Sequence, residues 1–232
     1  MSISITTIKA RLDREDIDNR NVATSGTIAS TGPAVTGTMT MFDTEAAVGD
    51  WLVILDANGD FLRDANDNWE ARRITAIASA TGATLESGFT VDASGDDYAI
   101  LKFIQIPGVV DSTGPNNAGA NIDNTTQDDG KYTSRTVGLI DTGQIDFNIL
   151  FRPSLAGHSG LYDEVDGQRS GFLIKWFAES KTLPPPDSSV NGRWLAKGTF
   201  SQFGGSSPAN DNEQVACSFL IEGKATLFAA GA

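Results

Sequence analysis

The stretch GQIDFNILF (residues 143–151) alternates apolar and polar side chains with a period of two. The apolar members are Ile145, Phe147, Ile149 and Phe151, and the polar members between them are Gln144, Asp146 and Asn148. Successive side chains of a β-strand point to opposite faces, so the pattern predicts a strand with one buried and one wet face.

Two further stretches of the C-terminal half carry the same alternation. In SGFLIKWF (170–177) the residues on one strand face are Phe172, Ile174 and Trp176. In EQVACSFLIEG (213–223) they are Val215, Cys217, Phe219 and Ile221. The chain also has 24 glycines, gathered with Thr, Ser, Asn and Asp between short apolar runs. Short apolar runs separated by turn-forming residues are typical of an all-β protein, and we expect a β-sandwich or barrel with one short helix.

The sequence divides into three regions. Residues 1–21 are polar, and we expect a strand at 3–9 followed by an arm or linker. Residues 22–103 contain about six short apolar runs separated by glycine-rich turns, which predicts a small barrel-like β module. Residues 104–232 form a second β domain with a loop at 111–138 that shows little apolar periodicity. In this domain Leu161 and Val165 are four residues apart, which predicts one or two turns of helix.

Composition argues against several classes of function. The chain has 17 basic and 30 acidic residues, and a net charge of −13 repels nucleic acid. No apolar run approaches the ~18 residues of a membrane span, and the N-terminus has no apolar core typical of a signal peptide. One cysteine and one histidine leave almost no basis for a disulfide or a zinc site.

Two patterns suggest chemistry without meeting its requirements. His158 lies next to Ser159 and upstream of Asp163, but the chain has no G-x-S-x-G elbow, and a surface histidine before a helix is the simpler interpretation. The pair Asp128-Asp129 lies in a glycine-containing loop, where we expect both carboxylates to be solvated.

The run DANGDFLRDANDN (56–68) places oxygen ligands at alternate positions, as a calcium loop does. An EF-hand loop then needs glycine at its sixth position and glutamate at its twelfth, where this chain has Phe61 and Asp67. A hairpin tip rich in Asn and Asp explains the run better.

The remaining singular residues are expected to serve the core. Cys217 falls on an apolar strand face, and the four tryptophans, Trp51, Trp69, Trp176 and Trp194, are spread over different elements. Only Trp69, in a polar stretch, invites another role. We therefore expect no enzyme activity, no catalytic or metal-binding residues and no cofactor.

Residues 104–152 carry a series of short motifs in a fixed order. They are Ile106-Pro107-Gly108, Ile122-Asp123-x-Thr125, Lys131-Tyr132-x-x-Arg135 and Gly138-Leu139-Ile140-Asp141-x-Gly143, followed by the alternating strand. In this order the chain resembles the tail tube (major tail) proteins of long-tailed bacteriophages, and the likeness extends over about 104–225. Asn124 and Gln127 depart from the small or β-branched residues expected at their positions.

The resemblance implies a structural virion protein that assembles into stacked hexameric rings, forming a negatively charged tube for DNA ejection. Its implied partners are other copies of itself, the tape measure, tail tip and terminator proteins, and genomic DNA that passes without specific binding; no membrane is implied. Its implied location is the virion tail, and the host cytoplasm during assembly. The implied inter-subunit residues are Ile122, Asp123, Thr125, Lys131, Tyr132, Arg135, Asp141 and Gly143. The polar face Gln144, Asp146 and Asn148 is the candidate lining of the lumen.

The module at 22–103 separately resembles small β modules appended to phage structural proteins. Its motifs are Thr40-x-Phe42, Val48-Gly49-Asp50 and Arg73-Ile74-x-x-Ile77, and the module is either inserted after a first strand or added at the N-terminus. Three other interpretations stay open: a carbohydrate-binding or adhesion β-sandwich with a flat tryptophan face, the tube protein of a contractile injection system, and a hydrolase using His158.

Overall fold

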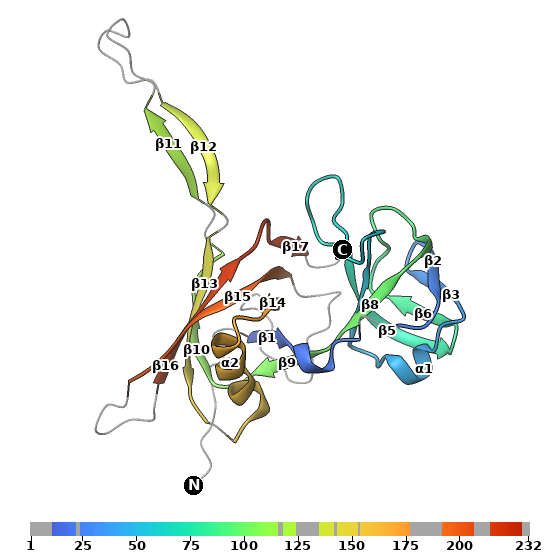
Figure 1. Ribbon diagram of the computed structural model, residues 1–232, viewed down its shortest axis with the longest axis horizontal. Coiled ribbons are helices and arrows are strands. Elements are labelled where there is room, and N and C mark those ends of the chain that lie inside the picture. Colours follow the sequence, from blue (N-terminus) through green and yellow to red (C-terminus); the bar gives the residue numbers. More distant parts are fainter. Residues whose placement is uncertain are drawn as a thin grey trace, which may run out of the picture.

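A computed structural model describes residues 11–21, 24–115, 118–123, 135–141, 143–152, 154–176, 192–206 and 214–228 (Figure 1). These residues form sheets of eight, seven and two strands, with two α-helices and one 3-10 helix. The expected all-β class is confirmed.

The larger sheet has the strand order β10-β13-β16-β15-β14-β1-β9, and β17 pairs with β15. Its strands are β1 (Arg11–Glu15), β9 (Phe103–Ile106), β10 (Val109–Ser112), β13 (Gln144–Leu150), β14 (Ser170–Trp176), β15 (Arg193–Ser206), β16 (Gln214–Ile221) and β17 (Thr226–Phe228). Every strand pair is antiparallel. The three strands predicted from alternation are therefore β13, β14 and β16, which the structure confirms.

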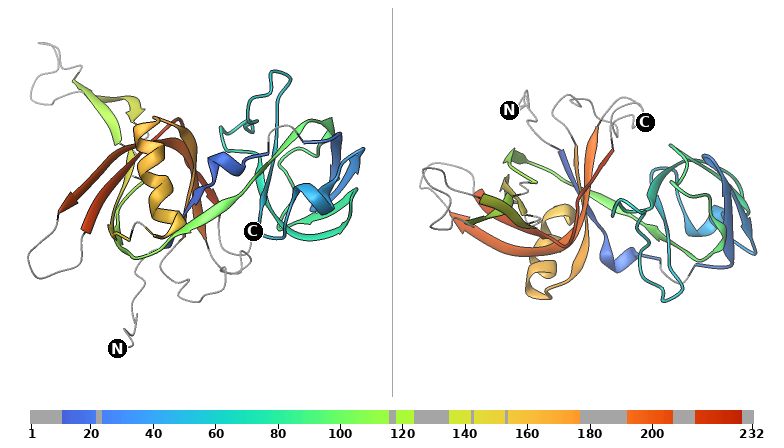
Figure 2. Two further views of the ribbon diagram at one scale, coloured as in Figure 1. Left: turned by 60° about the horizontal axis from the view of Figure 1, so that its bottom comes forward. Right: turned by 90° about the horizontal axis from the view of Figure 1, so that it is seen from above.

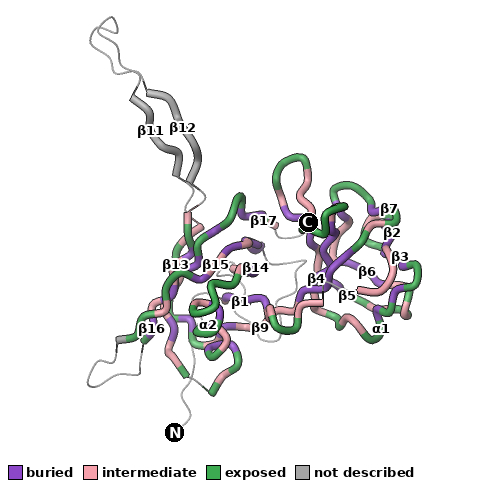
Figure 3. The backbone as a smooth tube through the Cα atoms, viewed as in Figure 1, coloured by how far each residue is buried: buried purple, intermediate pink, exposed green. Residues whose placement is uncertain are grey.

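One face of this sheet, the inner face, curls around an apolar core. The core takes one side of each alternating strand, including Ile145, Phe147 and Ile149 of β13, all buried (Figure 3). Helix α2 (Ala156–Asp166) packs on β15 and β9 and adds Leu161 to this core (Figure 2). The predicted helix is confirmed and is longer than expected.

The smaller, seven-stranded sheet curls around a second core in the order β7-β2-β3-β6-β5-β4-β8. Its elements are β2 (Thr27–Thr31), β3 (Ala34–Thr38), α1 (Phe42–Glu45), β4 (Trp51–Ile54), β5 (Ala71–Ser79), β6 (Gly82–Leu85), β7 (Ser94–Asp96) and β8 (Tyr98–Leu101). We call this unit the module; it stands beside the larger sheet (Figure 1).

The chain reaches the module from inside the larger sheet. Strand β1 is followed by the 3-10 helix Ile17–Asn19, then by the module, and β9 returns to pair antiparallel with β1. Residues 11–15 thus form an internal strand where the sequence suggested an arm. Only Leu12 of this strand is apolar, and its charged neighbours are buried by ion pairs, so hydrophobic periodicity could not reveal it. The predicted strand at 3–9 lies outside the described residues.

The expected loop at 111–138 contains regular structure. β11 (Ala118–Asp123) and β12 (Arg135–Asp141) pair into an antiparallel hairpin that projects away from the larger sheet (Figure 1). The sequence AGANID of β11 has Ile122 as its only large apolar side chain, so its alternation is too weak to predict a strand.

Candidate functional site

The outer face of the larger sheet is polar over β10, β13 and β16. Gln144 is exposed, and Asp146 and Asn148 are half-buried on the side of β13 opposite the core, as predicted. Asp146 accepts hydrogen bonds from Gln144 Nε2 at 2.9 Å and from Ser218 Oγ at 2.6 Å, and Asn148 Nδ2 donates to Asp111 at 2.8 Å. This polar wall is therefore a cross-strand network that carries two carboxylates.

A shallow hollow of about 360 Å³ lies on the polar wall. Thr113 and Gln202 line it together with the three hydrogen-bonded strands. The charged side chains that line the hollow are the carboxylates of Asp111 and Asp146, which accept hydrogen bonds through oxygen. The hollow therefore suits water and cations better than phosphate.

The motif residues inferred from the resemblance are distributed along the hairpin. Ile122 and Asp123 end β11 and pair with Thr136 and Arg135, at the end of the hairpin far from the sheet. Asp141 ends β12 near the larger sheet. Thr125, Lys131, Tyr132 and the Asp128-Asp129 pair lie outside the described residues.

Gly143 forms the joint between the hairpin and β13. Its φ of +72° is in the left-handed region that favours glycine, and its carbonyl accepts a hydrogen bond from the Ile221 amide at 3.2 Å. The hairpin therefore leaves the sheet through a joint whose backbone direction is fixed by β16.

The junction between the module and the larger sheet is a third core. It joins Trp51, Val53, Trp69, Ala71 and Leu101 of the module to Phe172, Ile174, Trp176 and Leu195 of the sheet. These sheet residues occupy the outer face of β14 and β15, beside the polar wall. The module is thus held by a dry interface and not by its two connecting segments alone.

Arg193 of β15 lies at the centre of this junction and is only 2 % exposed. Its guanidinium carbon lies 4.9 Å from the ring centroid of Trp51, 5.3 Å from that of Trp176 and 4.8 Å from that of Phe228. It pairs with Glu86 of the module, while its Nε has no hydrogen-bond partner. Desolvation lowers the pKa of Arg193, and Glu86 opposes that shift.

Trp69 belongs to the same junction and is buried. Arg63 stacks on its indole at 3.6 Å, Phe172 packs edge-on at 5.3 Å, and its backbone N–H donates to Thr226 Oγ1 at 2.8 Å. Three of the four tryptophans that looked dispersed in the sequence therefore meet, and Trp51, Trp69 and Trp176 are not available as a flat exposed stacking face.

His158 is not a surface residue, and that prediction is wrong. It lies inside α2, 0 % exposed, where its Nδ1 accepts the Arg152 N–H at 3.0 Å. Its Nε2 must then carry the proton, which it donates to the Pro107 carbonyl at 2.6 Å. Both ring nitrogens are used to hold the helix against the end of β9, so the imidazole is structural.

Replacing His158 with alanine should lower the free energy of unfolding by roughly 2–3 kcal/mol, because a buried donor and a buried acceptor lose their partner. Urea unfolding followed by circular dichroism measures the change. Ser159→Ala, at the exposed neighbouring position, is the matched control and should change stability by less than about 0.5 kcal/mol. Equal effects of the two substitutions would contradict the structural role.

A buried ion pair holds α2 against β1. Arg14 contacts Glu164, and its guanidinium also donates to the carbonyl oxygens of Ala156 at 3.0 Å and Gly157 at 3.3 Å. Desolvation raises the pKa of Glu164 to about 7, and Arg14 opposes that shift. The helix is thus clamped through a carboxylate whose charge is costly to bury.

The raised pKa of Glu164 predicts a specific pH dependence. Between its ordinary pKa of 4.5 and about 7 the folded state keeps a proton that the unfolded state has released, so stability falls as pH rises through this window. Relative to Glu164→Gln, the wild type should lose up to about 3 kcal/mol across the window, at about 1.4 kcal/mol per pKa unit. Asp163→Asn, on the exposed face, should differ from the wild type by the same amount of stability at every pH. If the stability difference between the wild type and Glu164→Gln does not change with pH, the raised pKa of Glu164 is refuted.

The acidic run 56–68 is used for turns. The carboxylate of Asp56 accepts the backbone N–H groups of Asn58 and Asp60, and that of Asp64 accepts those of Asn66 and Asn68, at 2.8–2.9 Å. Within the described residues no three His, Cys, Asp or Glu side chains are grouped to hold a metal ion. Cys217 is buried as predicted, and desolvation raises the pKa of its thiol to about 12.

A scan against protein-family models matches none, and a search of curated proteins finds no match. Over the described part of the chain, no helix has the length and apolar character needed to cross a bilayer.

Proposed function

We propose that the chain is a self-assembling structural subunit, the tail tube protein of a long-tailed bacteriophage, whose rings stack into a hollow tube. The rings are proposed to be hexameric and to carry the polar wall on the lumen. Two carboxylates on that wall and a net charge of −13 would keep the surface from holding DNA phosphates as the genome passes.

The observation that carries the proposal is the β11–β12 hairpin. Among the described elements its extensive contacts are between its own two strands, and it projects beyond the larger sheet (Figure 1). A lone two-stranded hairpin is marginally stable in water at best. A second copy of the chain in the next ring would supply the missing partner surface.

The edges of the larger sheet also support assembly. β10 and β9 are its two outer strands, so each has a side that pairs with no described strand of this chain. Unpaired strand edges are templates for another chain, and here an adjacent subunit of the same ring would extend the sheet. Such head-to-tail contacts close into rings when the rotation allows it.

Negative-stain electron microscopy of the purified protein over a range of concentrations, with size-exclusion chromatography, tests the proposal. We expect rings or hollow tubes with a lumen wide enough for duplex DNA. A protein that stays monomeric at all concentrations, salts and in the presence of a nucleating ring would refute self-assembly.

A further inference from the structure

Strand β17 (Thr226–Phe228) is held from two sides, by the larger sheet and by the module. On the sheet side it pairs with the first three residues of β15, Arg193–Leu195. Among the described strands, none pairs with the second edge of β17. A three-residue strand at a sheet edge has few backbone hydrogen bonds to hold it, so its position depends on what its side chains contact.

The two side chains of β17 that face the module are both in contact with it. Thr226 is buried, and its Oγ1 accepts the backbone N–H of Trp69 at 2.8 Å. The ring of Phe228 lies edge-on to that of Trp51, with the centroids 5.7 Å apart. The guanidinium carbon of Arg72 lies 5.5 Å from the centroid of the Phe228 ring. The module therefore holds β17 by a buried hydrogen bond and by aromatic contacts.

The turn that leads into β17 is also bound to the module. Arg63 Nη2 donates to the carbonyl oxygen of Glu222 at 3.1 Å, and Lys224 Nζ donates to the carbonyl oxygen of Asn66 at 2.8 Å. With the contacts of β17, the module thus touches every second residue from 222 to 228. We call residues 222–228 the strap.

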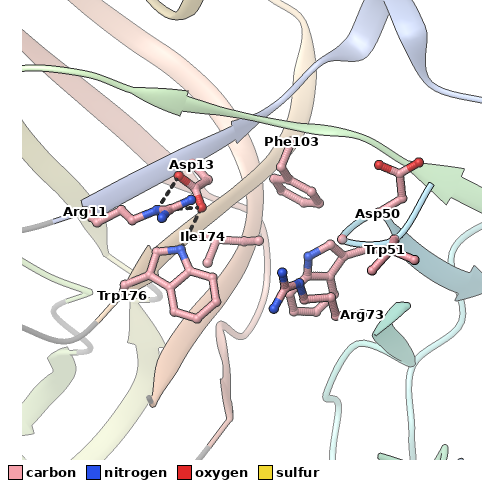
Figure 4. A pocket seen from close by; sticks show the side chains of 10 residues that line it. Arg11, Asp13, Asp50, Trp51, Arg73, Phe103, Ile174 and Trp176 are labelled. Atoms are coloured by element: carbon pink, nitrogen blue, oxygen red, sulfur yellow. Dashed lines mark hydrogen bonds and ion pairs between the residues drawn. The ribbon is translucent and has the colours of Figure 1, made fainter. Parts of the chain in front are cut away.

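The direct contact between the two units is open on one side. Ile174 of the sheet lies between the indoles of Trp51 and Trp176, and a pocket of about 260 Å³ opens beside these side chains (Figure 4). Trp51 is nevertheless buried, and the ring of Phe228 supplies part of its cover. The strap therefore adds packing that the two units do not give each other directly.

The residues of β17 serve the junction and not the two separate cores. In the described part of the chain, only the junction core packs against a residue of β17, which is Phe228. Displacing β17 would leave the buried N–H of Trp69 without its acceptor and take one of three rings from the Arg193 guanidinium. Both losses weaken the docking of the module and leave the apolar contacts inside each unit intact.

We propose that the strap is a lock for the module. With β17 in place the module is docked on the larger sheet, and with β17 displaced it is released and stays joined through its two connecting segments. Because both states keep the two separate cores, the exchange between them is a local opening of the chain and not its unfolding. This goes beyond the proposed role in tube assembly and does not depend on it.

Removing β17 tests the lock directly. A stop codon after Ala225 removes β17 and keeps Ala225, which is buried in the core of the larger sheet. Spin labels on Thr36→Cys of β3 and Ser159→Cys of α2 report the distance between the two units, since both positions are exposed and the native Cys217 is buried. Pulsed electron paramagnetic resonance should give one narrow distance for the full chain and a broad distribution for the shortened one.

Two results from the shortened chain would overturn the proposal. A distance as narrow as that of the full chain would show that the direct contact alone docks the module. Loss of the circular dichroism signal of both units would show that β17 is part of a common core and not a separable lock.

Full-length variants give a second measurement that does not rely on the shortened chain. Phe228→Ala leaves Thr226 in place, yet by loosening the strap it should speed hydrogen exchange of the Trp69 amide about tenfold or more. Leu227→Ala is the matched control, because Leu227 is exposed on the other face of β17, and it should change the exchange rate less than about twofold. Equal exchange rates of the Trp69 amide in these two variants would refute the lock.

Discussion

Replacing Arg193 with alanine is expected to lower the free energy of unfolding by about 3–5 kcal/mol, because the buried Glu86 carboxylate loses the one guanidinium with which it forms an ion pair among the described residues. The same change removes the guanidinium that lies among the rings of Trp51, Trp176 and Phe228. We expect the module and the larger sheet to lose their common unfolding transition, which chemical denaturation with circular dichroism and tryptophan fluorescence would resolve into two steps.

The matched control is Arg169→Ala, which removes a solvent-facing ion pair and should cost less than about 1 kcal/mol. A second control removes both charges of this ion pair: Arg193→Met combined with Glu86→Gln should recover much of the loss, since two neutral side chains replace a desolvated ion pair. If Arg193→Ala costs no more than Arg169→Ala, the junction is not held as described.

Removing the β11–β12 hairpin is expected to abolish assembly while leaving a folded monomer. β10 and β13 are adjacent antiparallel strands, and the Thr113 N–H donates to the Asp146 carbonyl at 2.8 Å. Residues 115–142 can therefore be replaced by a short Asn-Gly turn that closes these strands directly. Size-exclusion chromatography and electron microscopy should show only monomers, because the surface that reaches the next ring is gone.

A loop replacement elsewhere separates this effect from general damage. The turn 56–60 of the module lies between Leu55 and Phe61, which form a β-bridge, so an Asn-Gly turn can replace it with little strain. That variant should assemble as the wild type does. Normal tubes from the protein without the hairpin would refute the hairpin's role in stacking.

β13 and β16 were predictable because they are half-buried and alternate apolar and polar residues as a one-sided strand must, and α2 carries Leu161 at helical spacing. β14 was predictable from the spacing of Phe172, Ile174 and Trp176, although it is buried on both faces, with Leu173 in the core of the larger sheet. β1 was not predictable in this way. Its sequence RLDRE is buried through charge pairing, with Glu15 bound by Arg20 and by the Phe172 N–H, and hydrophobic periodicity does not register such burial.

The candidate sites were less accessible to sequence reasoning. The polar face of β13 follows from alternation alone, and its hydrogen bonds to Asp111 and Ser218 agree with a polar surface. The junction did not follow, because Trp51 and Trp176 are far apart in the chain and meet only once the module has docked. The burial of His158 did not follow either, because nothing in the polar sequence around it indicates that its imidazole faces inward.

The module's position between two paired strands bears on how such a chain can be altered by recombination. Glu15 of β1 and Phe103 of β9 are paired neighbours, so the two ends of the inserted segment lie together and any compact domain with adjacent termini could be spliced there. The junction core restricts this freedom. A foreign domain would uncover Phe172, Ile174, Trp176 and Arg193, so a viable exchange must carry the matching outer face of β14 and β15 with it. The module and the outer face of β14 and β15 must therefore be exchanged together, although they are separate in the sequence.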